Sequence, residues 1–124
     1  MDYLEELKKE FPEIRAFDED DFYWEQEAYD YLKQNDTENA GKIFKKLCLS
    51  QPAHHGGFEG LAFVYYKTGE KDKALWFMEK AIAITQSPLI DYTIAISTIK
   101  EMETNLINIK ENKNLIEWWN TTDE

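Results

Sequence analysis

The chain of 124 residues is 43% hydrophobic and 15% aromatic, with five glycines and three prolines, which predicts one folded domain over residues 1–124 and excludes a disordered chain. Acidic residues outnumber basic residues by 25 to 14, which gives a net charge of −11. We therefore expect no nucleic acid and no membrane surface as partners, because both are bound through clustered Lys and Arg.

The N-terminal stretch, residues 1–17, is expected to form a short helix that ends before Pro12 and packs on the part of the chain that follows. Its apolar face consists of Tyr3, Leu4, Leu7 and Phe11. The stretch lacks the basic start and apolar centre of a secretion signal. The acidic run Asp18–Asp21 then precedes the next helix, where carboxylates cap exposed N–H groups; a docking site for a basic partner is the alternative.

The middle of the chain repeats itself at an offset of 34 residues. The matched pairs are Trp24 with Phe58, Ala28 with Ala62, Tyr31 with Tyr65, Ala40 with Ala74, and Phe44 with Met78. Large and small residues alternate at helical spacing within each unit, so alanine lets two helices approach and aromatic rings fill the remaining space. This period predicts two stacked helical hairpins, over residues 21–54 and 55–88.

Turn residues support these boundaries. Asp36 or Thr37 is placed to cap the second helix of the first hairpin, which should stop near Ser50. In the second hairpin, Gly69 supplies the left-handed conformation that ends a helix, and a helix over residues 71–85 should stop before Pro88.

These residues resemble the tetratricopeptide-repeat family. The second unit carries Phe58, Leu61, Ala62, Tyr65, Gly69, Ala74, Met78 and Ala81 at the family's positions, whereas the first has Glu27 where Leu is usual and Asn35 where Gly is usual. The resemblance implies an all-α fold: two hairpins stacked as a short right-handed solenoid, with an N-terminal helix and a long C-terminal capping helix. A third repeat is incomplete, because Asn108 and Asn112 stand where Ala and Phe are needed.

The region 89–120 is therefore expected to cap the stack. Its apolar stripe predicts a helix from about Leu89 to Ile109, broken near residues 111–112. The stripe consists of Leu89, Tyr92, Ile96, Ile99, Met102 or Glu103, and Leu106. Further on, Trp118 and Trp119 cannot both face one side of a helix, so one can complete the core while the other lies at an interface. Core burial or simple surface exposure is favoured over a dimer contact, and which of the two tryptophans is in the core stays open.

No catalytic motif is apparent, and we expect neither enzymatic activity nor a cofactor. Adjacent histidines such as His54 and His55 diverge on a helix and make poor ligands for one metal ion, so a loop role is expected for them. Cys48 is expected in the core without a neighbour that would activate its thiol. Because this cysteine has no second cysteine to pair with, we expect a cytoplasmic protein.

The family's geometry implies that the first helix of each hairpin lines a concave groove that binds a partner. The positions that would face it are Phe22, Glu25, Tyr29, Leu32, Lys33, Glu59, Phe63, Tyr66 and Lys67. The alternative is that flanking helices cover them. The Lys and Asn clamp by which some members of the family grip acidic tails is absent, since Glu25, Tyr29 and Gly60 occupy its positions. The expected partner is a protein or peptide with apolar anchors and some Lys or Arg.

A second, weaker resemblance concerns residues 42–49 followed by 58–61, which look like the first-to-second repeat junction of the class II chaperones of type III secretion. The expected function is a non-catalytic adaptor or chaperone. Two alternatives stay open: an acidic immunity or antitoxin-type inhibitor of a basic protein, and a self-associating scaffold. We expect a monomer or a weak homodimer.

Overall fold

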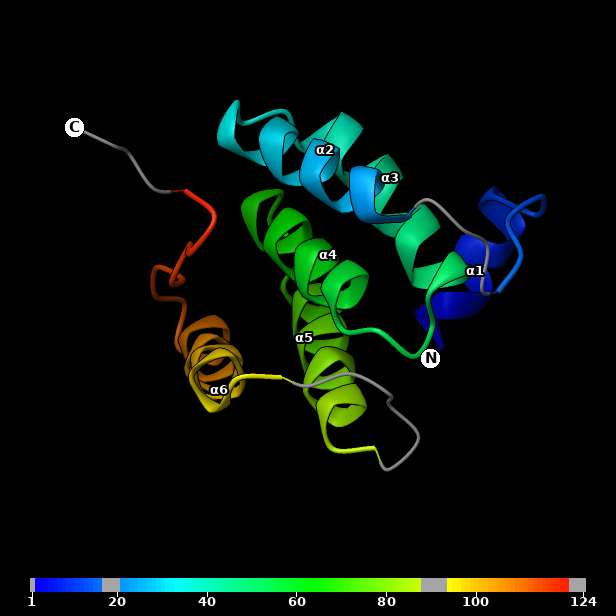
Figure 1. Cartoon of the computed structure of the whole chain (residues 1–124). Coiled ribbons are helices and arrows are strands. Elements are labelled where there is room, and N and C mark those ends of the chain that lie inside the picture. The colour runs from blue at the N-terminus through cyan, green and yellow to red at the C-terminus, as the bar shows by residue number, and fades with distance from the viewer. Residues whose placement is uncertain (1, 17–20, 88–93, 121–124) are drawn as a thin grey trace.

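A computed structural model describes residues 2–16, 21–87 and 94–120, except for the side chains of residues 21 and 22. These residues form six helices and no strand. The helices are α1 (Tyr3–Glu10), α2 (Asp21–Lys33), α3 (Thr37–Ser50), α4 (Gly56–Lys67), α5 (Lys71–Thr85) and α6 (Ile96–Lys110), as labelled in Figure 1. The predicted all-α fold class is confirmed. Most of the acidic run predicted to cap α2 lies outside the described residues.

The two predicted hairpins are α2 with α3 and α4 with α5, and they end their first helices in the same way. Asn35 (φ 61°) and Gly69 (φ 83°) adopt the left-handed conformation. One residue later, the N–H of Asp36 donates to the carbonyl of Tyr31 and that of Glu70 donates to Tyr65, both at 2.8 Å. Each partner in the second turn lies 34 residues after its counterpart, so the sequence repeat is also a repeat of backbone geometry.

Close packing joins the two hairpins through α3 and α4. A Cβ atom added to Gly60 would overlap the ring of Phe44, so only glycine permits this approach. Gly60, which the family alignment assigned to a clamp position, therefore faces α3. Of the ten matched repeat positions, Trp24 and Tyr31 are only partly buried and pack against the core. The other eight are confirmed as buried: Ala28, Ala40, Phe44, Phe58, Ala62, Tyr65, Ala74 and Met78.

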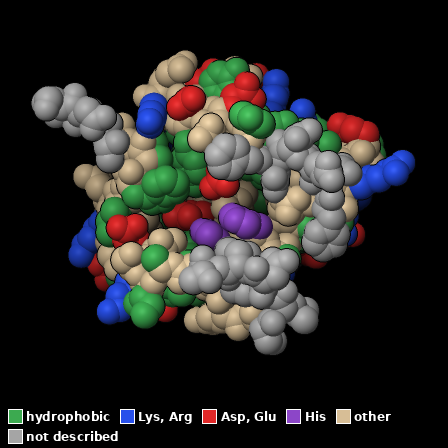
Figure 2. Space-filling view, in the orientation of Figure 1, with side chains coloured by type: hydrophobic (Ala, Val, Ile, Leu, Met, Phe, Trp, Pro, Cys, Tyr) green, Lys and Arg blue, Asp and Glu red, His purple; other side chains and the backbone are tan. Residues whose placement is uncertain are grey.

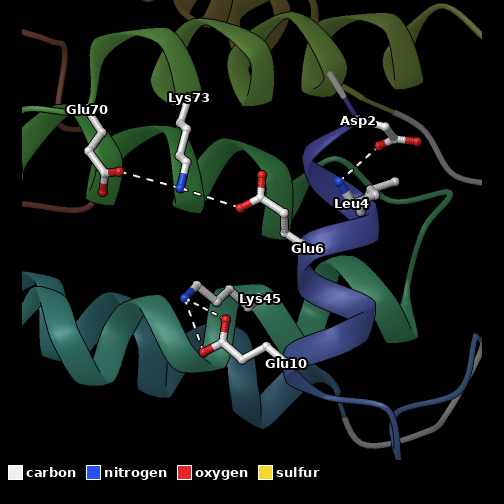
Figure 3. Close-up of polar contacts among 7 residues, drawn as sticks. All are labelled: Asp2, Leu4, Glu6, Glu10, Lys45, Glu70 and Lys73. Carbon is white, nitrogen blue, oxygen red and sulfur yellow. Dashed lines mark hydrogen bonds and ion pairs between the residues drawn. The ribbon is translucent and has the colours of Figure 1, made fainter.

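Helix α1 crosses the second helices of both hairpins. Glu10 forms an ion pair with Lys45 of α3 at 3.0 Å, and Lys73 of α5 lies 3.8 Å from Glu6 (Figure 3). The ring of Tyr3 contacts Trp76 of α5 edge to face, with 5.6 Å between centroids. The predicted packing of α1 on the first hairpin is therefore correct and extends to the second.

The predicted C-terminal helix is shorter than expected. Helix α6 begins at Ile96, directly after Ala95, whose backbone is extended (φ −64°, ψ 140°). Leu89 and Tyr92 lie outside the described residues. Ile96 is 71% exposed, so its place in the predicted core stripe is wrong.

The buried side chains of α6 are Met102, Asn105 and Ile109. The helix ends at Lys110, and Asn112 (φ 59°) adopts the left-handed conformation, so the break predicted near residues 111–112 is confirmed. Figure 1 shows α6 beside α5, with the chain continuing from its end toward α2 and α4. The predicted stacking of the two hairpins as a right-handed solenoid stays a prediction.

Candidate functional site

The predicted groove is occupied by the end of the chain itself. Residues Lys113–Asn120, which we call the C-terminal segment, contain no helix and lie against α2 and α4. Trp119 is only 4% exposed. Its ring lies 5.4 Å from that of Phe63 on α4 and 6.1 Å from that of Tyr29 on α2. The segment thus closes the space between the first helices of the two hairpins.

The neighbouring tryptophan makes a more exposed contact with the same two helices. The ring of Trp118 lies 4.8 Å from Tyr29, and its indole N–H donates to a carboxylate oxygen of Glu59 at 3.0 Å. Trp118 remains 42% exposed. The expectation of one tryptophan in the core is confirmed for Trp119, whereas an interface at Trp118 stays a prediction; both residues lie in a turn and not in a helix.

The last turn of α4 fixes the other edge of the C-terminal segment. The hydroxyl of Tyr66 donates to the backbone carbonyl of Lys113 at 2.6 Å. Lys67 forms an ion pair with Glu117 at 3.0 Å, and its ammonium group lies 5.6 Å from the centre of a Trp119 ring. Aromatic, ionic and backbone contacts are therefore combined within one surface.

Helix α6 holds the middle of the C-terminal segment through one amide side chain. The backbone N–H of Ile116 donates to the side-chain oxygen of Asn105 at 2.7 Å, and the side-chain nitrogen of Asn105 donates to the carbonyl of Ile116 at 3.1 Å. Asn105 is fully buried. Sequence analysis missed this residue; the only signal was an amide at a position three residues after Met102 and four before Ile109, both on the buried face of α6.

Two buried polar atoms at the contact between the C-terminal segment and α2 have no hydrogen-bond partner among the described residues: the hydroxyl of Tyr29 and the indole nitrogen of Trp119 itself. Burial raises the pKa of Tyr29 well above its usual value, so both groups are donors. An unpaired buried donor costs roughly 1–3 kcal/mol. The seating of the segment is therefore imperfect.

Open space borders the same contact. A cavity of about 700 Å³ lies between α2 and the two tryptophans, and it is lined in part by Glu25 and Lys33. A second cavity, of about 480 Å³, lies between α4 and residues 114–117. The segment covers the groove without filling it.

A cluster of titratable groups lies at the other end of the groove. A cavity of about 300 Å³ is lined by Glu25, Glu59, Glu101, His54 and His55 among others. Figure 2 shows the two histidines side by side at the centre of one face, with acidic side chains next to them. Their rings are stacked, with centroids 5.0 Å apart. The predicted loop role is confirmed for His54 and His55, which lie between α3 and α4.

Burial sets the charge of this cluster. It raises the pKa of Glu59 to about 7, a rise that Glu25 and Glu101 reinforce and the hydrogen bond from Trp118 opposes. Burial and the neighbouring histidine lower the pKa of His55 to about 4. His55 lies 3.9 Å from Glu59, and the neutral forms of both groups are the ones that burial favours. Within the described parts of the chain, no group of three or more His, Cys, Asp or Glu side chains is arranged to hold a metal ion.

The structure brings most of the predicted groove residues together under or beside the C-terminal segment. Tyr29, Leu32, Glu59 and Phe63 are buried, Tyr66 and Lys67 contact the segment, and Glu25 and Lys33 line its border. The side chain of Phe22 lies outside the described residues. The groove positions Tyr29 and Phe63 are covered, as the alternative expected, but the cover is Trp119 of a non-helical segment and not a flanking helix.

Comparison with known proteins adds no relative: no family model, no curated protein and no solved structure matches this chain. Among the described residues, no helix is both long and apolar enough to cross a membrane.

Proposed function

We propose that this protein is a non-catalytic interaction module of the tetratricopeptide-repeat type, acting in the cytoplasm as an adaptor or chaperone. It holds a segment of a partner protein between α2 and α4. The observation that supports this proposal is the packing of Trp118 and Trp119 on Tyr29 and Phe63, because in this contact a non-helical segment of the chain itself lies on the surface through aromatic side chains.

The chemistry of the surface suggests what the partner segment carries. Tyr29 and Phe63 offer aromatic faces, on which a large apolar side chain gains most of its binding free energy. The cavity at the end of the same surface is lined by Glu25 and Glu101, whose carboxylates favour a Lys or Arg of the partner. A partner with apolar anchors and a basic residue fits both features.

Site-specific photo-crosslinking in the cells that express the protein tests this proposal. A benzoyl-phenylalanine is introduced at Asp30 or Lys33, which line the cavity between α2 and the tryptophans, and in a matched control at Glu79, an exposed position on α5. We expect a discrete adduct from the two α2 positions and none from Glu79. Adducts from Glu79 alone, or none at any position, would refute groove binding.

The same experiment separates the alternatives. An inhibitor that covers a basic protein with a broad acidic face would crosslink from Glu79 as well as from α2. A self-associating scaffold would give an adduct of twice the chain mass of 14.7 kDa. The adaptor proposal requires an adduct of a different mass that depends on the α2 positions.

A further inference from the structure

We propose that the last part of the chain, Glu117–Asn120, is a built-in competitor for the α2–α4 groove. The partner segment that displaces it carries the same recognition elements: two adjacent aromatic residues preceded by a carboxylate. This inference rests on the proposed function and adds to it the regulation of the groove and the chemistry of its ligand.

Three consecutive residues of the competitor each have their own partner on the groove. The carboxylate of Glu117 pairs with Lys67 at 3.0 Å, the indole N–H of Trp118 donates to Glu59 at 3.0 Å, and the ring of Trp119 enters the aromatic site. Side-chain contacts of three different kinds at three successive positions specify a sequence. They therefore define what another segment must present to bind in the same place.

The contacts of the chain allow residues 117–120 to dissociate from the groove while α6 remains packed on α5. Residues up to Ile116 are held on α6 by the two hydrogen bonds to Asn105. Among the described residues, the ion pair of Glu117, the hydrogen bond of Trp118 and the ring contacts of both tryptophans are made with α2 and α4, and Trp118 meets α6 only across the cavity that Glu101 also lines. Release of residues 117–120 therefore leaves α6 in place on α5.

When residues 117–120 lie in the groove, the groove still has a buried donor without a partner in the described part of the chain and open space beside the segment. The Tyr29 hydroxyl is a buried donor without a partner among the described residues while Trp119 covers it. Cavities of about 700 and 480 Å³ flank the segment on both sides. A partner that supplies an acceptor oxygen to Tyr29 or fills either cavity binds better than the chain's own end, which has the advantage only of being tethered.

The test uses the full chain and a labelled peptide, Asn-Leu-Ile-Glu-Trp-Trp-Asn, that copies residues 114–120. Its affinity is measured by fluorescence anisotropy for the wild type and for Trp119→Ala. Because removal of the internal anchor opens the groove, we expect the variant to bind the peptide about tenfold more tightly, or more. A peptide with both tryptophans replaced by alanine is the control and should bind neither protein.

A charge reversal then tests the register. Adding Lys67→Glu to the Trp119→Ala chain should abolish binding of the copied peptide, and a peptide with Lys at the position of Glu117 should restore it. Loss without rescue would refute the assigned ion pair.

Two further outcomes would overturn the inference. The first is that the wild type and a Trp119→Ala variant with a native circular dichroism spectrum bind the peptide equally well or not at all. If Trp119→Ala does not fold, Glu117→Lys replaces it, because this substitution changes a side chain outside the aromatic core. Glu117→Lys must then show the same increase in affinity for the unchanged peptide. The second is a dimer of the wild type at micromolar concentration, since the segment would then exchange between copies. A partner that crosslinks at Lys33 equally in both proteins leaves the proposed function intact and refutes only the competition.

Discussion

The charge of Glu59 offers a direct test of how α4 is covered. The side chain is 2% exposed, with Glu25 of α2, Glu101 of α6 and His55 around it. Glu59→Gln keeps the shape of the side chain and an oxygen that accepts the indole N–H of Trp118, but carries no charge at any pH.

The pKa values determine how much the charge of Glu59 changes the free energy of unfolding. The pKa of Glu59 is about 7 in the folded protein against an ordinary 4.5, a difference equivalent to about 3 kcal/mol. Because the folded pKa is the higher one, the folded state binds the proton more tightly. The contribution of Glu59 to the free energy of unfolding is therefore fully present below pH 4.5 and is lost as the pH rises through about 7. His55, with its folded pKa of about 4 against 6.5, acts in the opposite direction, since its stability is lost as the pH falls from 6.5 to 4. The two contributions therefore largely offset each other in the wild type.

The difference between the variant and the wild type isolates Glu59. Urea unfolding followed by circular dichroism gives the free energy of unfolding of each protein from pH 5 to pH 8. We expect the stability of Glu59→Gln relative to the wild type to increase by about 2–3 kcal/mol over this range, whatever its value at pH 5. Glu103→Gln, which removes a charge from an exposed position on α6, corrects for the change in net charge.

A relative stability that stays flat from pH 5 to pH 8 would refute the reasoning, because it would mean that water reaches the Glu59 carboxylate and that the C-terminal segment does not cover it. Repeating the comparison in a His55→Asn background removes the histidine that lies 3.9 Å from Glu59. The slope assigned to Glu59 must persist there.

Three other predictions concern packing and reactivity. Gly60→Ala should destabilise the protein by about 1–3 kcal/mol, because the added Cβ would overlap the facing phenylalanine ring of α3. Gly41→Ala should stabilise it by up to about 1 kcal/mol, because the added Cβ lies 3.4 Å from its nearest neighbour. Urea unfolding measures both free energies, and equal effects would contradict the close helix contact. Asn105→Leu should cost roughly 1–3 kcal/mol or more and accelerate hydrogen exchange of the Ile116 amide, because that N–H loses its acceptor; unchanged exchange would disprove the anchor on α6. Burial raises the pKa of the Cys48 thiol, so an aromatic disulfide reagent at pH 8 should modify it only as fast as the protein unfolds. Modification at the rate of a free thiol would show that solvent reaches Cys48 in the folded protein.

The two hairpins could be predicted because each of their signals is local. The spacing of large and small side chains, the cap at Asp36 and the left-handed Gly69 each act within one or two helical turns, and the 34-residue offset shows the same local signals twice. The helix predicted over residues 71–85 has those bounds in the structure. Asn35 was noted as a departure from the family's glycine, yet it adopts the same left-handed backbone, which asparagine tolerates better than most residues.

The cover of the groove could not be predicted, because no local pattern determines where an irregular segment lies. Trp118 and Trp119 gave two apolar side chains without a helical or strand period, and their partners Tyr29 and Phe63 are more than 50 residues away in the sequence. The register of α2 and α4 predicted which side chains face the groove. It carried no information on which part of the chain lies opposite them.

The end of the 34-residue pattern and the closure of the groove are connected through two asparagines. Asn108 and Asn112 stand where the repeat pattern would place Ala and Phe, and both have a role at the end of α6. Asn112 takes the left-handed conformation, and the N–H of Lys113 donates to the carbonyl of Asn108 at 2.8 Å, as at the ends of α2 and α4. After those two earlier turns the chain starts a helix that packs against its predecessor. After this one it has no apolar helical stripe to offer, so the apolar side chains that remain, above all Trp119, are buried by the nearest surface with aromatic faces, which is the groove between α2 and α4.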